Sequence, residues 1–120
     1  MLLKTLAIGG DHSITYPIVK AHAQFRGEFD ILHIDAHGDL YDEFEGDKYS
    51  HACPFARIME QKLATRLMQV GIRAINPHQR EQAAKFGVKV IEMRNINQIQ
   101  NLQFHHPLYI SLDLDGIDPA

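Results

Sequence analysis

Short apolar runs alternate with segments of helical periodicity along the whole chain. A run of about four to eight apolar residues between turn signals is typical of a buried strand, and apolar residues three and four positions apart are typical of a helix. The pattern predicts strands at residues 2–8, 30–34, 67–72, 88–93 and 107–114. It predicts helices at residues 14–23, 52–63 and 77–86, and a short helical stripe at residues 96–102.

Residues at the predicted helix ends support these boundaries. Ser13 is a candidate N-cap for the first helix. Asn76 and Pro77 suit the start of the third helix, and Gly87 suits its end. Strands that alternate with helices favour a parallel sheet with helices on its faces, and so an α/β fold of about five strands. No internal repeat, low-complexity tract or linker interrupts the sequence, so we expect a single domain over residues 1–120.

Composition narrows the classes of function. The chain has 120 residues, 45% hydrophobic and 22% charged, which is ordinary for one soluble domain. Its net charge is −3 and it has no long basic run, so neither a nucleic acid nor a membrane is an expected partner. No apolar run approaches the length of a membrane span. Cys53 is the single cysteine, which excludes an internal disulfide and suits a reducing cytoplasm, the expected location.

The stretch most informative about chemistry follows the second predicted strand. Asp35, His37 and Asp39 occupy every second position, so in an extended chain their side chains point the same way. Two carboxylates and an imidazole side by side suit a divalent cation such as Mn²⁺, Fe²⁺, Co²⁺ or Zn²⁺. The alternative is a polar loop in which Asp and Gly serve turn chemistry.

Two other predicted strand ends carry residues of the same kind. His12 follows the first strand, and Asp113 and Asp115 lie two positions apart at the end of the last strand. Because the carboxyl ends of parallel strands meet at one edge, all these side chains would share one cleft. So many carboxylates suit two divalent cations, whose shared, bridging hydroxide would attack a planar carbon. The alternative for residues 113–119 is a turn-rich strand end or a calcium loop, although the EF-hand spacing and its terminal Glu are missing.

Taken together, three segments resemble the signature motifs of the ureohydrolases, the family of arginase, agmatinase and their relatives. They are residues 9–13 (GGDHS), 35–39 (DAHGD) and 111–119 (SLDLDGIDP), in the family's order and across nearly the whole chain. The resemblance implies an arginase-type three-layer α/β/α sandwich with a parallel sheet, of which residues 1–120 would form a single partial ureohydrolase domain. It also implies two Mn²⁺ ions as cofactors and hydrolysis of a guanidinium group to urea and an amine.

The resemblance also assigns roles to individual residues. The implied metal ligands are His12 and Asp39 on one ion, His37 and Asp115 on the other, and Asp35 and Asp113 bridging both. His51 and Asp39 are the candidate catalytic residues. His51 matches the family's active-site-loop histidine, which implies a part in protonating the leaving amine. The alternative for His51 is an ordinary loop histidine before a helix.

Agmatine, which would give putrescine and urea, is the favoured substrate. Arginases carry an Asn shortly after the second motif that contacts the α-carboxylate of the substrate, and Tyr41 stands at that place here. Residues 39–41 and 49–55 look like those of agmatinases. The acidic loop at residues 42–47 would attract a small cationic guanidino substrate, although a solvated surface explains its composition equally well. The alternatives are arginine, another guanidino acid and formimidoylglutamate.

The chain departs from the family's pattern in its extent. It lacks the family's earlier strands and a later portion that includes a Glu that binds the guanidinium. The predicted strand at residues 2–8 would then have unpaired edges, so we expect a homo-oligomer or another partner chain to cover them, or this segment to be displaced. The alternative to an enzyme is a truncated ureohydrolase fragment that binds metal without turnover, or that merely folds.

A third class is a hydrolase with a single Zn²⁺, of the histone-deacetylase type. One metal would leave His12 and Asp39 without an ion to bind, which argues against this class. Cys53 follows His51 closely, but no group that would orient a base is evident, so Cys53 is not assigned as a nucleophile. The other histidines match no motif and are assigned to structural or surface positions: His22, His33, His78, His105 and His106.

Overall fold

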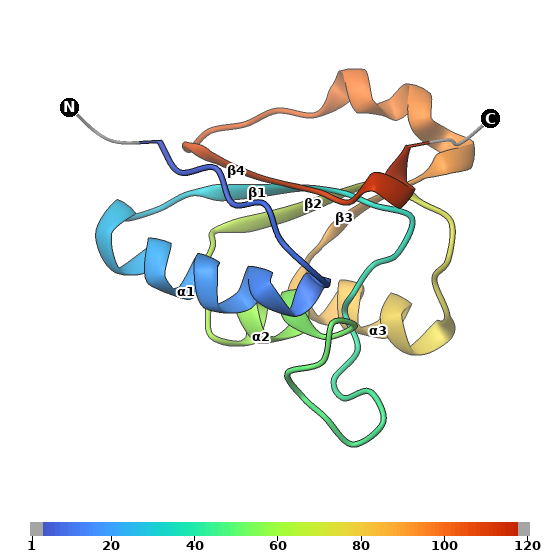
Figure 1. The fold of residues 1–120 in the computed structure, drawn as a ribbon. Helices are drawn as coiled ribbons and strands as arrows, with labels where there is room; N and C mark the ends of the chain where they lie inside the picture. The colour runs from blue at the N-terminus through green and yellow to red at the C-terminus, as the bar shows by residue number, and fades with distance from the viewer. Residues whose placement is uncertain (1–3, 118–120) are drawn as a thin grey trace.

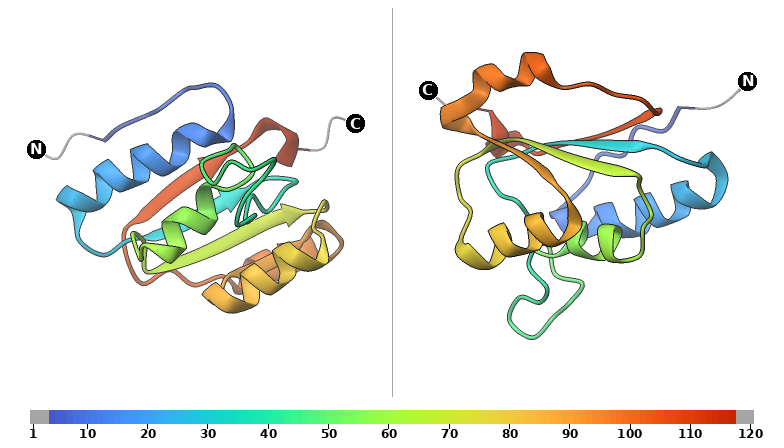
Figure 2. Two further views of the ribbon diagram at one scale, coloured as in Figure 1. Left: turned by 90° about the horizontal axis from the view of Figure 1, so that it is seen from below. Right: turned by 180° about the vertical axis from the view of Figure 1, so that it is seen from behind.

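The computed structural model describes residues 4–117, which fold around one parallel sheet. The strand order is β3-β2-β1-β4, with β1 at Asp30–Ile34, β2 at Arg66–Ile72, β3 at Lys89–Glu92 and β4 at Leu108–Leu112. Three α-helices cover one face of this sheet (Figures 1 and 2): α1 (Thr15–Arg26), α2 (Pro54–Glu60) and α3 (Pro77–Phe86). The 3₁₀ helices are η1 (His12–Ile14), η2 (Met93–Asn101) and η3 (Leu114–Gly116), and η2 packs near β2 and β3 from the opposite side. Within residues 4–117, no helix has the length and apolar character that crossing a membrane requires.

The α/β class and the parallel sheet are confirmed, but the strand predicted at residues 2–8 is wrong for the part that the structure describes. Residues 4–8 form no strand, and Leu2 and Leu3 lie outside the described range. The sheet therefore has four strands among the described residues, not about five. Leu6 and Ile8 are 85% and 90% exposed. An apolar run forms a strand only where another strand supplies the ladder of hydrogen bonds, and no described strand pairs with this one.

The helix ends agree in part with the prediction. Asn76 caps α3 by accepting a hydrogen bond from the Gln79 amide at 2.9 Å, and Gly87 ends that helix in the left-handed region at φ 64°. The predicted cap at Ser13 is wrong. Asp11 instead accepts the Ser13 amide at 3.0 Å and caps η1, which precedes α1. The stripe predicted at residues 96–102 is part of the 3₁₀ helix η2.

The hydrophobic core lies between the sheet and the three α-helices. Val19 of α1 and Phe55 and Ile58 of α2 pack with Ile31 and Leu67 of the sheet, and each of these side chains is at most 1% exposed. Burial of this many large apolar groups holds the helices to one face. The helices thereby fix the loops that follow β1 and β2 at the carboxyl edge of the sheet.

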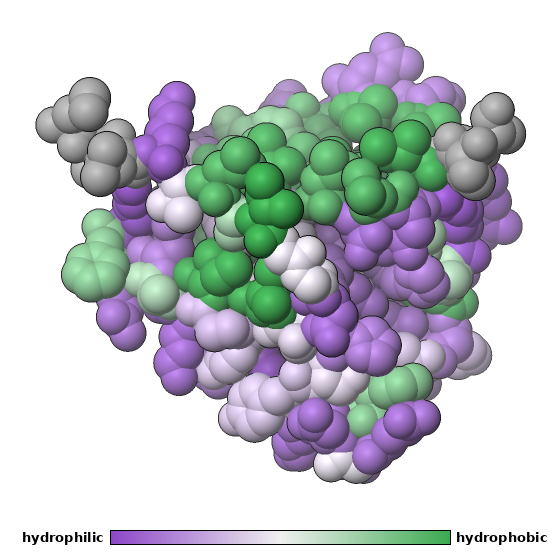
Figure 3. All heavy atoms as spheres, viewed as in Figure 1, coloured by the Kyte–Doolittle hydropathy of each residue, from purple (hydrophilic) through white to green (hydrophobic). Residues whose placement is uncertain are grey.

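The opposite face of β4 is apolar and open. Leu108, Ile110 and Leu112 are 36%, 59% and 55% exposed. Figure 3, seen from the same side as Figure 1, shows hydrophobic surface across the upper part of the molecule, where Figure 1 places β4. Strand β4 also lies at the end of the described sheet, so one of its edges has no neighbour there. The expected coverage of exposed sheet edges by another copy or a partner chain stays a prediction.

The left-handed turn at Gly87 gives a test of the fold. We expect Gly87→Ala to lower the free energy of unfolding by about 1 kcal/mol, because a Cβ is strained at positive φ. No heavy atom lies within 4 Å of the position that this Cβ would take, so a clash with neighbours does not contribute. Asparagine tolerates this conformation, so Gly87→Asn is the matched control and should lose less. Urea unfolding measures both, and equal losses would contradict the assignment.

Candidate metal centre

The candidate ligands gather where the carboxyl ends of β1 and β4 meet. Beyond β1, the Asp35 amide still donates to the Val70 carbonyl at 3.1 Å, and the Asp113 amide donates to the Ile34 carbonyl at 2.9 Å. These bonds continue the sheet past the named strands and align the residues that follow. Asp39 adopts φ 49°, a left-handed conformation that aspartate tolerates, and the chain turns away there.

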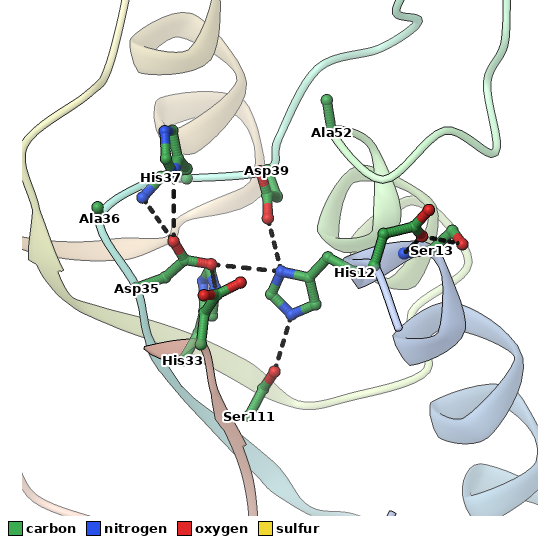
Figure 4. Close-up of polar contacts among 12 residues, drawn as sticks. His12, Ser13, His33, Asp35, Ala36, His37, Asp39, Ala52 and Ser111 are labelled. Atoms are coloured by element: carbon green, nitrogen blue, oxygen red, sulfur yellow. Dashed lines mark hydrogen bonds and ion pairs between the residues drawn. The ribbon is translucent and has the colours of Figure 1, made fainter. Parts of the chain in front are cut away.

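Five of the six predicted ligands, together with His33, form two groups that share Asp35. The ligand atoms within each group all lie within 4.8 Å of one another, and the groups are His12, His33, Asp35 and Asp39 in one, and Asp35, His37 and Asp115 in the other. Figure 4 shows Asp35 and Asp39, from the segment after β1, pointing toward the ring of His12, which comes from η1.

In each group a histidine predicted as a ligand sets its Nδ1 against carboxylate oxygens. His12 Nδ1 lies 2.6 Å from Asp39 Oδ2 and 3.3 Å from Asp35 Oδ2. His37 Nδ1 lies 3.4 Å from Asp35 Oδ1 and 3.1 Å from Asp115 Oδ2. Imidazole nitrogen and carboxylate oxygen around two adjacent points fit two divalent cations with one carboxylate between them. The residues present therefore fit the binuclear centre that the sequence predicts.

Asp113, the sixth predicted ligand, is oriented differently. Its carboxylate accepts the Asp115 amide at 3.0 Å and caps η3, and it belongs to neither group. The prediction that Asp113 and Asp115 point the same way assumed an extended chain, but the 3₁₀ turn begins at Leu114 and ends that alternation. Asp113 still lines the same cleft as the other ligands.

Protons on histidine balance the carboxylates of the cluster. Burial opposes protonation of His12, but Asp35 and Asp39 outweigh it and raise the pKa of His12 to about 9. Burial likewise disfavours ionised Asp35, but hydrogen bonds from His12 and His33 hold its pKa well below the usual range. Burial and the nearby Asp35 carboxylate raise the pKa of Asp115. The cluster thus favours positive charge at the position that a cation would take.

A cleft of about 590 Å³ opens above the ligands. Carboxylates and histidines of the cluster form part of its wall, and Tyr41 and Phe44 add aromatic surface. His51, the predicted proton donor, lies in the same cleft, where its ring meets Phe44 edge-on at 5.6 Å between centroids. No lysine or arginine is among the described lining residues, which are Asp11, His12, His37, Asp39, Tyr41, Phe44, His51, Ala52, Ala74, Ile75, Asn76, Gln79, Asp113 and Asp115.

Arg57, a residue that the sequence reasoning missed, anchors the acidic loop beside this cleft. It is only 3% exposed and donates to the Asp42 carbonyl at 3.0 Å, to Asp42 Oδ1 at 2.8 Å and to the Lys48 carbonyl at 3.5 Å. The tip of the loop turns at Glu45 and Gly46, both at positive φ, between the paired backbones of Phe44 and Asp47. Arg57 therefore joins the two arms of the loop that carries Phe44. Helical spacing places Arg57 away from the side of the helix that carries Phe55 and Ile58, so the periodicity carried no signal of its burial.

Comparison with known proteins places these features in context. A family model described as the arginase family matches residues 3–120. The chain is 52% identical over 126 residues to mitochondrial arginase 1 of Arabidopsis thaliana. This match covers 98% of the chain and 37% of the plant protein. It is 43% identical over 122 residues to an N(1)-aminopropylagmatine ureohydrolase of Thermus thermophilus, covering 96% of this chain and 41% of that protein. The structure matches arginase from Medicago truncatula with a TM-score of 0.86 and 50% identity, over 92% of this chain and 38% of that one.

Gly116 offers a test of how the centre is held together. A Cβ at residue 116 would lie 2.9 Å from the Asp35 nitrogen and 3.0 Å from its Cα, so Gly116→Ala must push η3 away from Asp35. We expect the affinity for Mn²⁺ to fall roughly tenfold or more, as it does when groups that orient ligands are displaced. Titration calorimetry measures this. Gly10→Ala, where a Cβ meets nothing within 4 Å, should bind as the wild type does, and equal binding by both variants would contradict the expectation.

Removal of the Arg57 guanidinium should loosen the acidic loop. We expect Arg57→Met to speed hydrogen exchange at the mutually bonded amides of Phe44 and Asp47 by about tenfold or more, because the loop loses hydrogen bonds worth about 1–3 kcal/mol. Arg80, whose exposed guanidinium pairs with Glu92, supplies the control Arg80→Met. Exchange in the loop that is unchanged in Arg57→Met, or equally faster in both variants, would show that Arg57 does not anchor it.

Proposed function

Because this chain belongs to the arginase family, we propose that it forms the metal-binding part of a ureohydrolase that cleaves the guanidino group of agmatine, releasing urea and putrescine. The observation that carries the proposal is the pair of ligand groups sharing Asp35 beneath an acidic cleft. The chain spans about 37% of the length of the first curated relatives it matches, so the activity of the whole protein belongs to the proposal.

We propose Mn²⁺ as the metal, with His12 and Asp39 holding one ion, His37 and Asp115 the other, and Asp35 between them. Asp113 could join as a second bridging ligand once its bond to the Asp115 amide is released. When bound, two such cations supply an activated water for attack on a planar guanidino carbon. His51, exposed in the cleft, would then deliver a proton to the leaving amine, which departs readily only when protonated.

The charge of the cleft supports agmatine over arginine. Agmatine carries two positive charges and no carboxylate, which suits a cleft whose described lining keeps the carboxylate of Asp11 beside the proposed metal ligands. The α-carboxylate of arginine would find no lysine or arginine in the described lining to pair with. Tyr41 and Phe44 give the aliphatic chain and its terminal ammonium an aromatic surface, which suits a cation.

One other substrate is favoured by a specific observation. Identity of 52% to a protein named arginase favours arginine. This alternative retains the metal centre and differs from the main proposal in what the cleft accepts.

One assay separates these functions. The chain is loaded with Mn²⁺, its metal content is counted, and urea release is measured from agmatine and from arginine. We expect two ions per chain and urea from agmatine at a rate at least about tenfold above that from arginine, because the α-carboxylate of arginine would lack a partner. A tenfold difference corresponds to about 1.4 kcal/mol. Treatment with a chelator should abolish release.

Tyr41→Asn is the matched variant of that assay, because it replaces the aromatic wall with the residue expected in arginases. We expect it to lower the preference for agmatine while leaving the metal content at two ions. Equal or faster turnover of arginine by the wild type would contradict the choice of agmatine. Two ions without urea would support a metal-binding remnant, and no bound metal would contradict the proposed function altogether.

A further inference from the structure

Three polar side chains form a row across the helix-covered face of the sheet, directly below the metal centre. His33 of β1 pairs in register with Gln69 of β2 on one side and with Ser111 of β4 on the other. Their exposed fractions are 0%, 0% and 8%. Buried polar groups cost free energy unless they are hydrogen-bonded, so a whole row of them in a core-facing layer requires an explanation.

Each member of the row bonds to a different part of the centre. Ser111 Oγ lies 2.9 Å from His12 Nε2, on the side of that ring opposite the carboxylates. His33 Nε2 lies 2.8 Å from Asp35 Oδ2, the oxygen that also faces His12. Gln69 Nε2 donates to the Gly38 carbonyl at 2.5 Å, just before Asp39. Figure 4 shows Ser111 and His33 meeting the cluster from below.

The neighbours of Gln69 fix the tautomer of His33. The Gly38 carbonyl can only accept a hydrogen bond, so the Gln69 atom beside it must be the amide nitrogen. That same nitrogen lies 3.1 Å from His33 Nδ1, which therefore accepts its second hydrogen. With Nδ1 as acceptor, the ring proton of a neutral His33 is on Nε2 and is donated to Asp35.

This donor determines how the two oxygens of Asp35 are used. Oδ2 accepts from His33 and faces His12, whereas Oδ1 accepts the His37 amide at 2.7 Å and faces the His37 ring. The carboxylate is thus held from below and from the loop, with one oxygen toward each ligand group. Without the His33 N–H, the Asp35 carboxylate would lose the hydrogen bond from β1 and keep the bond from the His37 amide to Oδ1.

Packing alone does not account for His33. Its ring lies against Phe55 with centroids 4.1 Å apart, a contact that a phenylalanine would also make. The Gln69 that orients it leaves its Oε1 buried without a hydrogen-bond partner among the described residues. A network that leaves one acceptor unpaired costs stability, so packing does not explain it, whereas the positioning of Asp35 does.

We propose that His33, oriented by Gln69, is a positioning residue of the metal centre, which sets the Asp35 carboxylate so that each oxygen serves a different ion. This rests on the proposed function, since it requires two metal ions. His33 itself remains a hydrogen-bond donor and is not a metal ligand, because Nδ1, its nitrogen without a proton, accepts a hydrogen bond from Gln69.

The test compares variants that keep or remove the donor. His33→Phe keeps an aromatic ring against Phe55 and removes the N–H, and His33→Met does so with a flexible side chain if the larger ring prevents folding. His33→Gln restores an N–H near the former Nε2. Ile31→Val, two positions earlier on the same face of β1 and fully buried in the hydrophobic core, is the control for packing. Each protein is examined by thermal unfolding, by calorimetric titration with MnCl₂ and by EPR of the Mn²⁺-loaded protein.

We expect His33→Phe or His33→Met to fold and to bind Mn²⁺ with an affinity lowered about 10- to 100-fold, with loss of the EPR signal of a coupled pair. His33→Gln should recover most of the affinity and the coupled signal, and Ile31→Val should bind as the wild type does. Wild-type affinity and coupling in the donor-free variants would overturn the proposal, as would equal losses in His33→Gln or in Ile31→Val. A wild-type chain that binds no Mn²⁺ would overturn the proposed function as well, so the two failures are distinguishable.

Discussion

Mutual repulsion among carboxylates is the constraint on which the metal centre depends. The parallel sheet delivers Asp35 and Asp115 to one edge, and Asp35 is 1% exposed there. Such a carboxylate is tolerated only with positive charge or hydrogen-bond donors on every side. His12, His33 and the His37 amide surround it in this structure. Divalent cations would do the same more strongly, which is why the most buried aspartate of the cluster is also the one shared by both ligand groups.

The sequence predicted those features that depend on local or periodic signals. The parallel α/β arrangement, the Asn76 cap and the Gly87 turn follow from such signals, and the structure has all three. The apolar run at residues 2–8 predicted a strand that residues 4–8 do not form, because pairing depends on a neighbour distant in the sequence. Asp113 was placed beside Asp115 by strand alternation, which the turn at Leu114 interrupts.

In the candidate site, too, local signals predicted some features, and contacts between distant residues decided the others. The motifs indicated which residues gather at the sheet edge, whereas the residues that hold them are visible only in three dimensions. His33 stands two positions before Asp35, so the alternation that led to Asp35, His37 and Asp39 already pointed to it. Its partner Gln69 is 36 residues away, and only the register of β1 with β2 brings the two together. Arg57 is similar, since its role depends on two loop carbonyls that helix periodicity does not reveal.

Metal binding and folding are coupled in a site of this kind. The ligands come from η1, the loop after β1 and η3, which lie far apart in an unfolded chain, so only the folded chain offers the complete set. A cation that binds the folded state alone stabilises it by about 2.7 kcal/mol when present at roughly one hundred times its dissociation constant. That is a large part of the roughly 5–15 kcal/mol by which domains are stable. The ions would therefore act as part of the fold at the carboxyl edge of the sheet as well as in the chemistry.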